Sequence, residues 1–265
     1  MKYEIGFIGC GNMGGVLAEK TLEKLGGKTV AVCDLSVEKT QPLVDKFSTT
    51  VLTAEELVKN CKFIVLGVKP QVAKIVIDPI KDYITEQTVV ISMMAGQDIK
   101  TVQSLFGKNV KVIRIMPNMP CKLSSGIIAY STSDEITLEE ENAFKNHFEK
   151  AGYIDKVEED LMDAVTALSG SGPAFVYAFA KSLMLGAIEC GFSKEKALLY
   201  ATKTVIGAGK MLDEFKEVDE LIKSVCSPGG TTLAGISELE KGNLYEVGAS
   251  AVKSAKNRAE ELRKN

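Results

Sequence analysis

The feature that most constrains this chain is a cluster of glycines directly after its first apolar segment. The short segment Glu4–Ile8 leads at once into Gly9-Cys10-Gly11-Asn12-Met13-Gly14, and an amphipathic stretch follows over Met13–Leu25. Glycines in the order G-x-G-x-x-G permit a tight strand-to-helix turn, a close approach of backbone to a pyrophosphate, and close packing of the helix on the strand. We therefore expect a strand–loop–helix unit that binds a dinucleotide. The residues expected to contact it are Gly9, Gly11, Asn12, Met13 and Gly14.

An acidic residue after the second apolar run supports this interpretation. Asp34 follows Thr29–Cys33 and lies about 20 residues beyond Gly14, the spacing at which a carboxylate accepts hydrogen bonds from the ribose of NAD. The same carboxylate would repel the 2′-phosphate of NADP, which Lys39 could receive. Asp34 taken alone favours NAD. The alternative is a carboxylate that only stabilises a helix N-terminus.

The chain divides into two parts by its hydrophobic pattern. Residues 3–131 alternate short apolar runs with amphipathic stretches, a pattern typical of a parallel sheet covered by helices on both faces. From Asp160 onward only helical periodicity remains. The predicted fold is α/β: a Rossmann-type, doubly wound parallel sheet in residues 1–158, followed by an all-helical domain in residues 159–265.

The predicted helices of the second part are apolar on more than one face. The helices expected over 160–190 and 194–214 have this pattern, which indicates burial against another subunit. The stretch Ala164–Leu185 is long enough to span a bilayer, but Gly170-Ser171-Gly172-Pro173 interrupts it and it carries Lys181. We expect a core or interface helix here and no membrane span.

A second glycine loop lies in the helical part. Ser227-Pro228-Gly229-Gly230-Thr231-Thr232 precedes a run with helical periodicity, so it is a loop that leads into a helix N-terminus. Bare backbone and hydroxyl groups at a helix N-terminus suit a small carboxylate. The alternative is an ordinary helix cap. The residues expected to bind substrate are Ser227, Gly229, Gly230, Thr231 and Thr232.

Three further segments end strands of the predicted sheet. They are Val68-Lys69-Pro70, Met94-Ala95-Gly96 and Met116-Pro117-Asn118. Ligands bind at the carboxyl ends of parallel strands, so all three point to one crevice. We expect cofactor contacts from Val68, Lys69, Pro70, Ala95 and Asn118. For Lys69 the alternative is a solvated charge, and Asn118 could contact either a nicotinamide amide or the substrate.

Composition excludes several functions. The net charge of −3 offers no basic surface for nucleic acid and no polybasic patch for a membrane. The single histidine, His147, excludes a multi-histidine zinc site, and we expect no metal. His147 itself reads as a surface or packing residue. The six scattered cysteines indicate reduced thiols, and no targeting segment is visible, so we expect a cytoplasmic protein.

Taken together, these motifs resemble the pyrroline-5-carboxylate reductase family. The resemblance covers nearly the whole chain. Besides the first glycine loop and Ser227–Thr232, it rests on Val68-Lys69-Pro70, Met116-Pro117-Asn118 and Leu168-Ser169-Gly170-Ser171-Gly172-Pro173-Ala174.

The resemblance implies a function and an assembly. It implies reduction of 1-pyrroline-5-carboxylate to L-proline, the last step of proline biosynthesis, with hydride from NADPH or NADH. It implies that the loop Ser227–Thr232 holds the substrate carboxylate and that Thr232, the expected catalytic residue, lies beside the ring nitrogen. It also implies a homodimer through the helical domain, and beyond that a decamer of five dimers.

The chain departs from the family pattern at three places. Met119 stands where the family has a hydroxyl residue, the Ser124-Ser125 region replaces a common glycine, and Cys33-Asp34-Leu35-Ser36 differs from the sequences of many NADP-using relatives. These departures concern the preference for NADP and not the class of reaction. Two alternatives to the function stay open beside the resemblance. One is another imine or hydroxy-acid dehydrogenase of similar architecture, and the other is a non-enzymatic dinucleotide sensor, which would not need a second anion loop.

Overall fold

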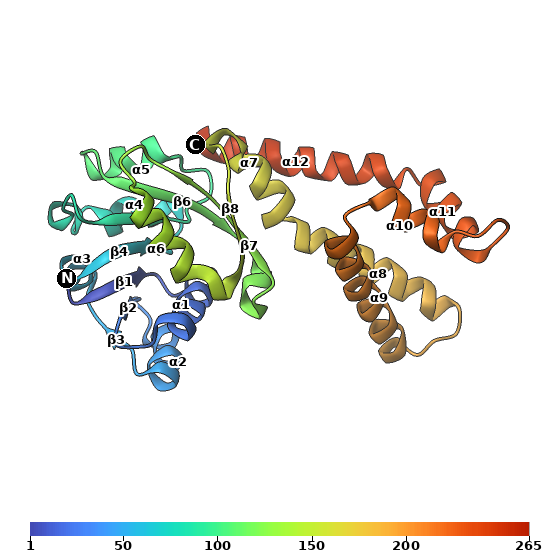
Figure 1. Cartoon of the computed structure of the whole chain (residues 1–265), viewed down its shortest axis with the longest axis horizontal. Helices are drawn as coiled ribbons and strands as arrows, with labels where there is room; N and C mark the ends of the chain where they lie inside the picture. Colours follow the sequence, from blue (N-terminus) through green and yellow to red (C-terminus); the bar gives the residue numbers. More distant parts are fainter. Residues whose placement is uncertain (265) are drawn as a thin grey trace. The chain divides into compact units, whose positions relative to one another are not determined.

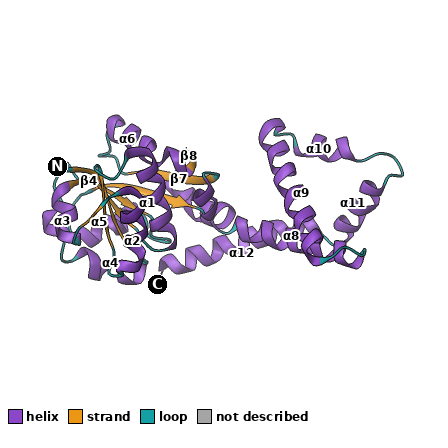
Figure 2. Cartoon of the chain, turned by 90° about the horizontal axis from the view of Figure 1, so that it is seen from below, coloured by secondary structure: helices purple, strands orange, loops and turns teal. Residues whose placement is uncertain are grey.

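A computed structural model describes residues 1–264 of the chain, with side chains through Glu261 (Figure 1). The chain forms two compact units. The first contains Met1–Ser171 together with the residues from Ala255 onward, and the second contains Gly172–Ser254. All strands of the described chain belong to the first unit, and the second is helical (Figure 2). The predicted boundary between 158 and 159 stays a prediction, and residue 265 lies outside the described residues.

The strands of residues 1–264 form one eight-stranded sheet in the order β3-β2-β1-β4-β5-β6-β7-β8. Their bounds are β1 Tyr3–Ile8, β2 Val30–Cys33, β3 Thr50–Val51, β4 Cys61–Leu66, β5 Val89–Ser92, β6 Lys111–Pro117, β7 Gly126–Thr132 and β8 Gly152–Lys156. Strand β1 pairs with β2 on one side and with β4 on the other, so the chain reverses its winding there. The carboxyl ends of β1 and β4 therefore flank the position at which such sheets bind ligands.

Helices cover both faces of the sheet, as the doubly wound prediction required. One apolar cluster joins the sheet to α1 (Asn12–Leu25), α2 (Val37–Phe47) and α6 (Leu138–Phe148). The other joins it to α3 (Ala54–Asn60), α4 (Pro70–Ile77) and α5 (Ile99–Phe106). Because both faces are covered, β5 is buried along its whole length and β4 is buried except at Lys62, which explains their apolar runs.

The sheet is parallel, as predicted, except at one strand pair. Strand β7 runs antiparallel to β6, while its other neighbour, β8, is parallel to it. The reason is the connection: a short 3₁₀ turn at Met119–Leu123 joins β6 to β7, and a parallel pair would need a helical crossover. Ser124 adopts a left-handed φ of 56° here, and a Cβ on Gly126 would lie 2.3 Å from Cys121 Sγ. The two-residue strand β3 was also missed.

Helix starts follow local side-chain chemistry and were predicted well. The spacings Thr53-x-x-Glu56 and Thr137-x-x-Glu140 in the sequence predict two capping boxes, and both are present, at the starts of α3 and α6. In each, the threonine hydroxyl accepts from the N3 backbone N–H, and the glutamate carboxylate accepts from the threonine backbone N–H. The sequence also predicts Ser193 as an N-cap, and it caps α9 (Lys194–Phe215).

His147 is a packing residue of the first unit. Its side chain is buried, and its ring contacts the Phe63 ring edge-to-face, with the centroids 4.7 Å apart. Burial, and after it the positive charge of Lys62, lowers the pKa of His147 to about 4. Its Nε2 lies 3.2 Å from Glu4 Oε1. The imidazole is therefore neutral at pH 7. Of the two interpretations, surface or packing, the structure confirms packing.

The predicted helix over 160–190 is interrupted. It consists of α7 (Met162–Val165), a π-turn at Thr166–Gly170 and α8 (Gly172–Glu189). No residue of α8 is buried within the described chain, so the expectation of a core helix was wrong and that of an interface helix remains. By length and hydropathy alone, one helical stretch of the described residues, Glu159–Glu189, could cross a bilayer.

The sequence periodicity predicts the remaining helices over 194–214, 217–225, 231–241 and 243–263, and they lie close to these positions. They are α9, α10 (Val218–Val225), α11 (Thr231–Lys241) and α12 (Leu244–Lys264), whose last residues belong to the first unit. Apolar side chains of α8 and α9 are exposed, among them Tyr177, Leu198 and Tyr200. Such a large exposed apolar surface indicates a partner.

A buried ion cluster ties the start of the interrupted helix to the sheet. Arg114 of β6 is 1% exposed; its Nη1 lies 3.4 Å from Glu159 Oε1 and its Nη2 lies 3.7 Å from Asp163 Oδ1. Asp163 is also buried, so the two charges depend on each other for stabilisation.

We expect Arg114→Leu to destabilise the protein by about 3 kcal/mol, because it leaves the buried Asp163 carboxylate without this guanidinium. Chemical denaturation followed by circular dichroism measures the change. The exposed pair Lys223–Glu220 provides the control, since Lys223→Met should cost less than about 1 kcal/mol. Equal costs for the two variants would contradict the role given to Arg114.

Candidate functional site

A cavity of about 1140 Å³ lies at the carboxyl ends of β1, β2, β4 and β5. All of its lining residues belong to the first unit. It brings together nearly all the predicted cofactor contacts from four separate parts of the sequence. Those that line it are Gly9, Gly11, Asn12, Met13, Gly14, Asp34, Val68, Lys69, Pro70 and Ala95. Asn118 is not among them.

Three glycines form the floor of this cavity by packing backbone against backbone. Gly9 has a φ of +96°, and a Cβ there would lie 2.6 Å from the Gly67 carbonyl oxygen. A Cβ on Gly14 would lie 2.1 Å from the Gly9 carbonyl oxygen, and one on Gly67 would lie 2.4 Å from it. These separations are too short for any side chain, so the contact between β1, α1 and β4 requires glycine at all three positions.

Gly11 differs from these three glycines because it has empty space beside it. No described atom lies within 4 Å of the position of its Cβ. Gly11 is also the N-cap of α1, and no described side chain caps that helix. A helix N-terminus with free N–H groups and room beside it suits a phosphate group. The residues present therefore fit a dinucleotide pyrophosphate at this point.

Asp34 has a second role that the sequence did not reveal. Its carboxylate accepts hydrogen bonds from the backbone N–H of Cys10 at 2.8 Å and of Ser36 at 2.9 Å, and from Lys39 Nζ at 3.3 Å. Burial raises the pKa of Asp34, but these donors outweigh it and hold the pKa below its usual value. Asp34 is therefore a fixed negative charge that ties the glycine loop to the β2–α2 turn.

The cavity has lining residues that the motifs did not indicate. Leu35 is fully exposed beside Asp34, and Ile75 of α4 is largely exposed, so both present apolar surface at the cavity. Ser36 and Glu55 add polar groups. Leu35 and Ser36 could have been predicted from their position in the sequence, because the loop directly after the second strand of such a sheet faces the adenosine half of a dinucleotide.

The predicted substrate loop lies in the second unit, and its backbone requires glycine at two positions. Gly229 has a φ of +68°, and Gly230, the N-cap of α11, would bring a Cβ within 2.3 Å of Ser227 Oγ. The Gly230 N–H donates to the Ser227 carbonyl at 2.9 Å, which closes the turn. No described side chain caps α11, so its first N–H groups and the Thr232 hydroxyl are available for an anion.

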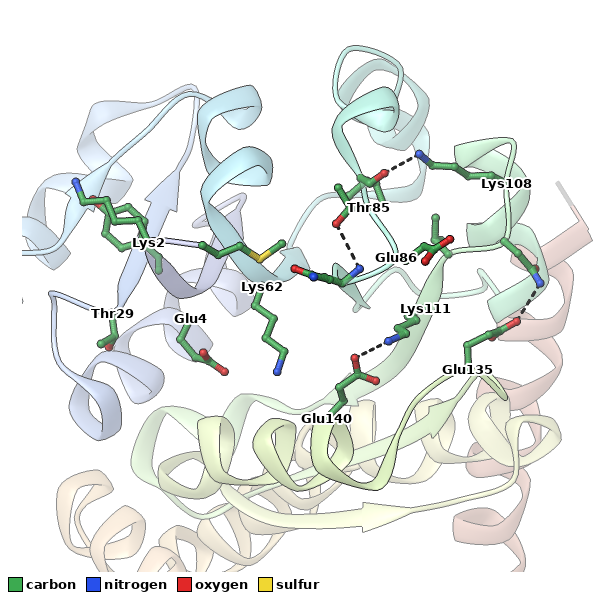
Figure 3. Close-up of a pocket in the computed structure, with 16 residues that line it drawn as sticks. Lys2, Glu4, Thr29, Lys62, Thr85, Glu86, Lys108, Lys111, Glu135 and Glu140 are labelled. Atoms are coloured by element: carbon green, nitrogen blue, oxygen red, sulfur yellow. Dashed lines mark hydrogen bonds and ion pairs between the residues drawn. The ribbon is translucent and has the colours of Figure 1, made fainter.

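A second cavity, of about 1360 Å³, lies at the amino ends of the strands (Figure 3). Lysines and glutamates line it, and several of them already bind one another or the backbone. Lys111 pairs with Glu140, Lys108 Nζ donates to the Ile84 carbonyl, and Asn109 donates to Glu135. Parallel sheets bind ligands at the carboxyl ends of their strands, so we assign the functional site to the first cavity.

Comparisons with known proteins agree with this geometry. A family model for pyrroline-5-carboxylate reductase dimerisation matches residues 159–262, and one for NADP oxidoreductase, coenzyme F420-dependent, matches residues 4–96. A pyrroline-5-carboxylate reductase of Aquifex aeolicus is 37% identical over 238 residues, which make up 89% of each chain. The chain belongs to the pyrroline-5-carboxylate reductase family. It is accordingly an NAD(P)H-dependent oxidoreductase of proline biosynthesis.

Solved structures of the family have the same fold. That of a pyrroline-5-carboxylate reductase from Coxiella burnetii is 31% identical, has a TM-score of 0.93 and covers 100% of both chains. That of a Plasmodium falciparum pyrroline carboxylate reductase with NADP bound is 28% identical, has a TM-score of 0.88 and covers 99% of both chains. The N-terminal, sheet-containing part of the chain is an NAD(P)-binding domain, and a helical dimerisation domain follows it; the family model for dimerisation covers residues 159–262.

We expect Gly11→Val to abolish cofactor binding without unfolding the protein, because its side chain meets only the space assigned to the pyrophosphate. Gly14→Val should instead unfold the first unit, since its side chain collides with the Gly9 backbone. Titration of NADPH fluorescence measures binding, and thermal melting measures folding. Normal NADPH affinity in a folded Gly11→Val variant would contradict the pyrophosphate assignment.

Proposed function

We propose that this chain reduces the C=N bond of 1-pyrroline-5-carboxylate to give L-proline, and that the two glycine loops divide the binding between them. The first loop holds the pyrophosphate of the cofactor, and the loop Ser227–Thr232 holds the substrate carboxylate. The observation that carries this proposal is that α1 and α11 both begin at a glycine with no described side-chain cap. Each helix therefore presents free N–H groups to an anion.

The bound nicotinamide supplies the hydride, so the protein's task is mainly to bind and orient. Gly229 and Gly230 leave the backbone of the second loop bare for the substrate carboxylate, and Ser227 and Thr231 add hydroxyl groups. The ring nitrogen would arrive protonated, and the Thr232 hydroxyl would accept a hydrogen bond from its N–H; the positive charge on this nitrogen is lost when hydride adds to the ring carbon, and the N–H stays on the product. Val68, Lys69, Pro70 and Ala95 hold the cofactor beside the glycine loop, at the ends of β4 and β5.

We expect Thr232→Ala to lower kcat/KM for 1-pyrroline-5-carboxylate by about 10-fold or more, because a hydrogen bond that strengthens in the transition state contributes about 1.4 kcal/mol. Thr232→Ser keeps the hydroxyl and is the matched control. Steady-state rates of NADPH oxidation test both variants. An unchanged kcat/KM in Thr232→Ala would remove this residue from the mechanism.

The choice between NADH and NADPH depends, in this proposal, on Asp34. Its buried negative charge lies at the end of β2, where the ribose of the adenosine half is expected, and it favours a free 2′-hydroxyl over a 2′-phosphate. Lys39, half exposed and 3.3 Å from Asp34, offsets part of this repulsion. We therefore expect the enzyme to use both cofactors, with NADH preferred.

We expect Asp34→Ser to raise the ratio of kcat/KM for NADPH over NADH by about 10-fold, because removing one charge next to the phosphate is worth roughly 1.4 kcal/mol. The assay follows oxidation of each cofactor when 1-pyrroline-5-carboxylate is added. Lys39→Gln is the matched control: it removes a positive charge at the same turn, so it should lower the same ratio. If both variants leave the ratio unchanged, cofactor choice does not depend on this turn.

We further propose a homodimer through the helical domain, with five dimers joined in a decamer. The exposed apolar side chains of α8 and α9 support a dimer contact on these helices. We also propose a cytoplasmic location. In the described residues all six cysteines are unpaired, which suits a reducing compartment.

A further inference from the structure

The side chain of Asn118 is fully engaged within the first unit, at the carboxyl end of β6. It is 9% exposed. Its Nδ2 donates at 3.2 Å to the carbonyl oxygen of Ser169 and at 3.2 Å to the Ser169 hydroxyl. Its Oδ1 accepts from the Ile127 N–H at 3.0 Å. The Ser169 side of this contact needs an N–H donor, and the Ile127 side needs an acceptor. The amide of Asn118 in this orientation supplies both.

Ser169 belongs to the π-turn Thr166–Gly170 that interrupts the long helix. The Ser171 N–H bonds to the Thr166 carbonyl five residues back, so this turn holds one residue more than an α-helical turn. Such turns are rare and concentrate at functional sites. The carbonyl of Ser169, which accepts from Asn118, is thus fixed by a side chain from the sheet.

The position of β6 places this contact at one end of the cofactor site. Asp34 and Leu35 mark the adenosine half at the end of β2, and the sheet order then passes from β2 through β1, β4 and β5 to β6. A dinucleotide extends across these strand ends, so its nicotinamide lies on the β5–β6 side. Asn118 follows Pro117, the last residue of β6, and is therefore on the nicotinamide side.

Two other contacts hold the beginning of the same segment. Besides its ion pair with Arg114 of β6, Glu159 accepts from the Ile99 N–H of α5 at 2.7 Å. The segment 159–169 is thus tied to β6 near both of its ends, by Arg114 at the first and by Asn118 at the last. Of these two contacts, only the one between Asn118 and Ser169 lies at the carboxyl ends of the strands.

We propose that Asn118 is a positioning residue for hydride transfer, which fixes the Ser169 backbone and the π-turn at the nicotinamide end of the site. This inference rests on the proposed function. It assigns Asn118 an indirect role through Ser169 in place of direct contact with cofactor or substrate. Its loss should therefore affect turnover and leave binding of the cofactor, held at the glycine loop, intact.

We expect Asn118→Leu to lower kcat by about 10-fold or more while the Kd for NADPH changes less than about 2-fold, because small misplacements near the reacting atoms are costly. Asn109→Leu is the matched control. Asn109 lies just before the same strand, at its opposite end, and binds Glu135. Its kcat should equal that of the wild type. An unchanged kcat in Asn118→Leu, or a parallel loss of NADPH binding, would overturn the proposal.

Asn118→Asp gives a test that a merely structural role would not pass, and it keeps the proposal falsifiable if the leucine variant fails to fold. A charged carboxylate can accept from Ile127 but repels the Ser169 carbonyl, whereas the protonated acid can donate to it as the amide does. Burial raises the pKa of such a carboxyl. The ratio of its kcat to that of the wild type should therefore rise as the pH is lowered from 8 to 5.5.

A ratio that stays constant over this range would contradict the role of the Ser169 contact. The wild-type enzyme is assayed first with 1-pyrroline-5-carboxylate and either cofactor. Failure of that reaction would contradict the proposed function, whereas success with normal turnover in the Asn118 variants would contradict this inference alone.

Discussion

The backbone contact among Gly9, Gly14 and Gly67 is the constraint on which the first unit depends. The carbonyl oxygen of Gly9 occupies the space that a Cβ on either of the other two would need. This contact brings the N-terminus of α1 against the ends of β1 and β4, at the place where the sheet reverses its winding. A helix N-terminus directed into a crevice between strand ends is what gives a neutral backbone affinity for a pyrophosphate.

The charged groups of the site hold loops and ligands in place and do not transfer protons. Asp34 is held ionised by backbone N–H donors and links the glycine loop to the turn that faces the adenosine half. The only histidine is buried against Phe63 and does not line the cofactor cavity. An enzyme whose cofactor supplies the hydride can work with such a site, because orientation of the reactants contributes much of the rate.

Local sequence signals predicted the parts of the fold that depend on neighbouring residues. The sequence has amphipathic stretches at Val37–Phe47, Ala54–Asn60 and Ile99–Phe106, and these are the observed bounds of α2, α3 and α5. Both capping boxes follow from the sequence because a cap requires residues only three positions apart. The same locality explains the failures. The direction of β7 is set by its pairing with β6, and Ser169 of the π-turn at Thr166–Gly170 is bonded by Asn118, which is far away in sequence.

The sequence by itself determined the doubly wound class, the glycine loop, the family resemblance and nearly all the residues that line the cofactor cavity. Each of these features follows either from the spacing of residues along one segment or from the fact that parallel strands have their carboxyl ends at the same end of the sheet. Only the tertiary structure decided which polar groups are already engaged. Asp34 and Asn118 each carry the chemistry of a ligand contact in the sequence, yet each also bonds to a distant segment, Asp34 to Cys10 and Asn118 to Ser169, which no local spacing connects to them. A hydrogen bond between distant segments is set by how the layers pack, and that packing is a property of the whole fold.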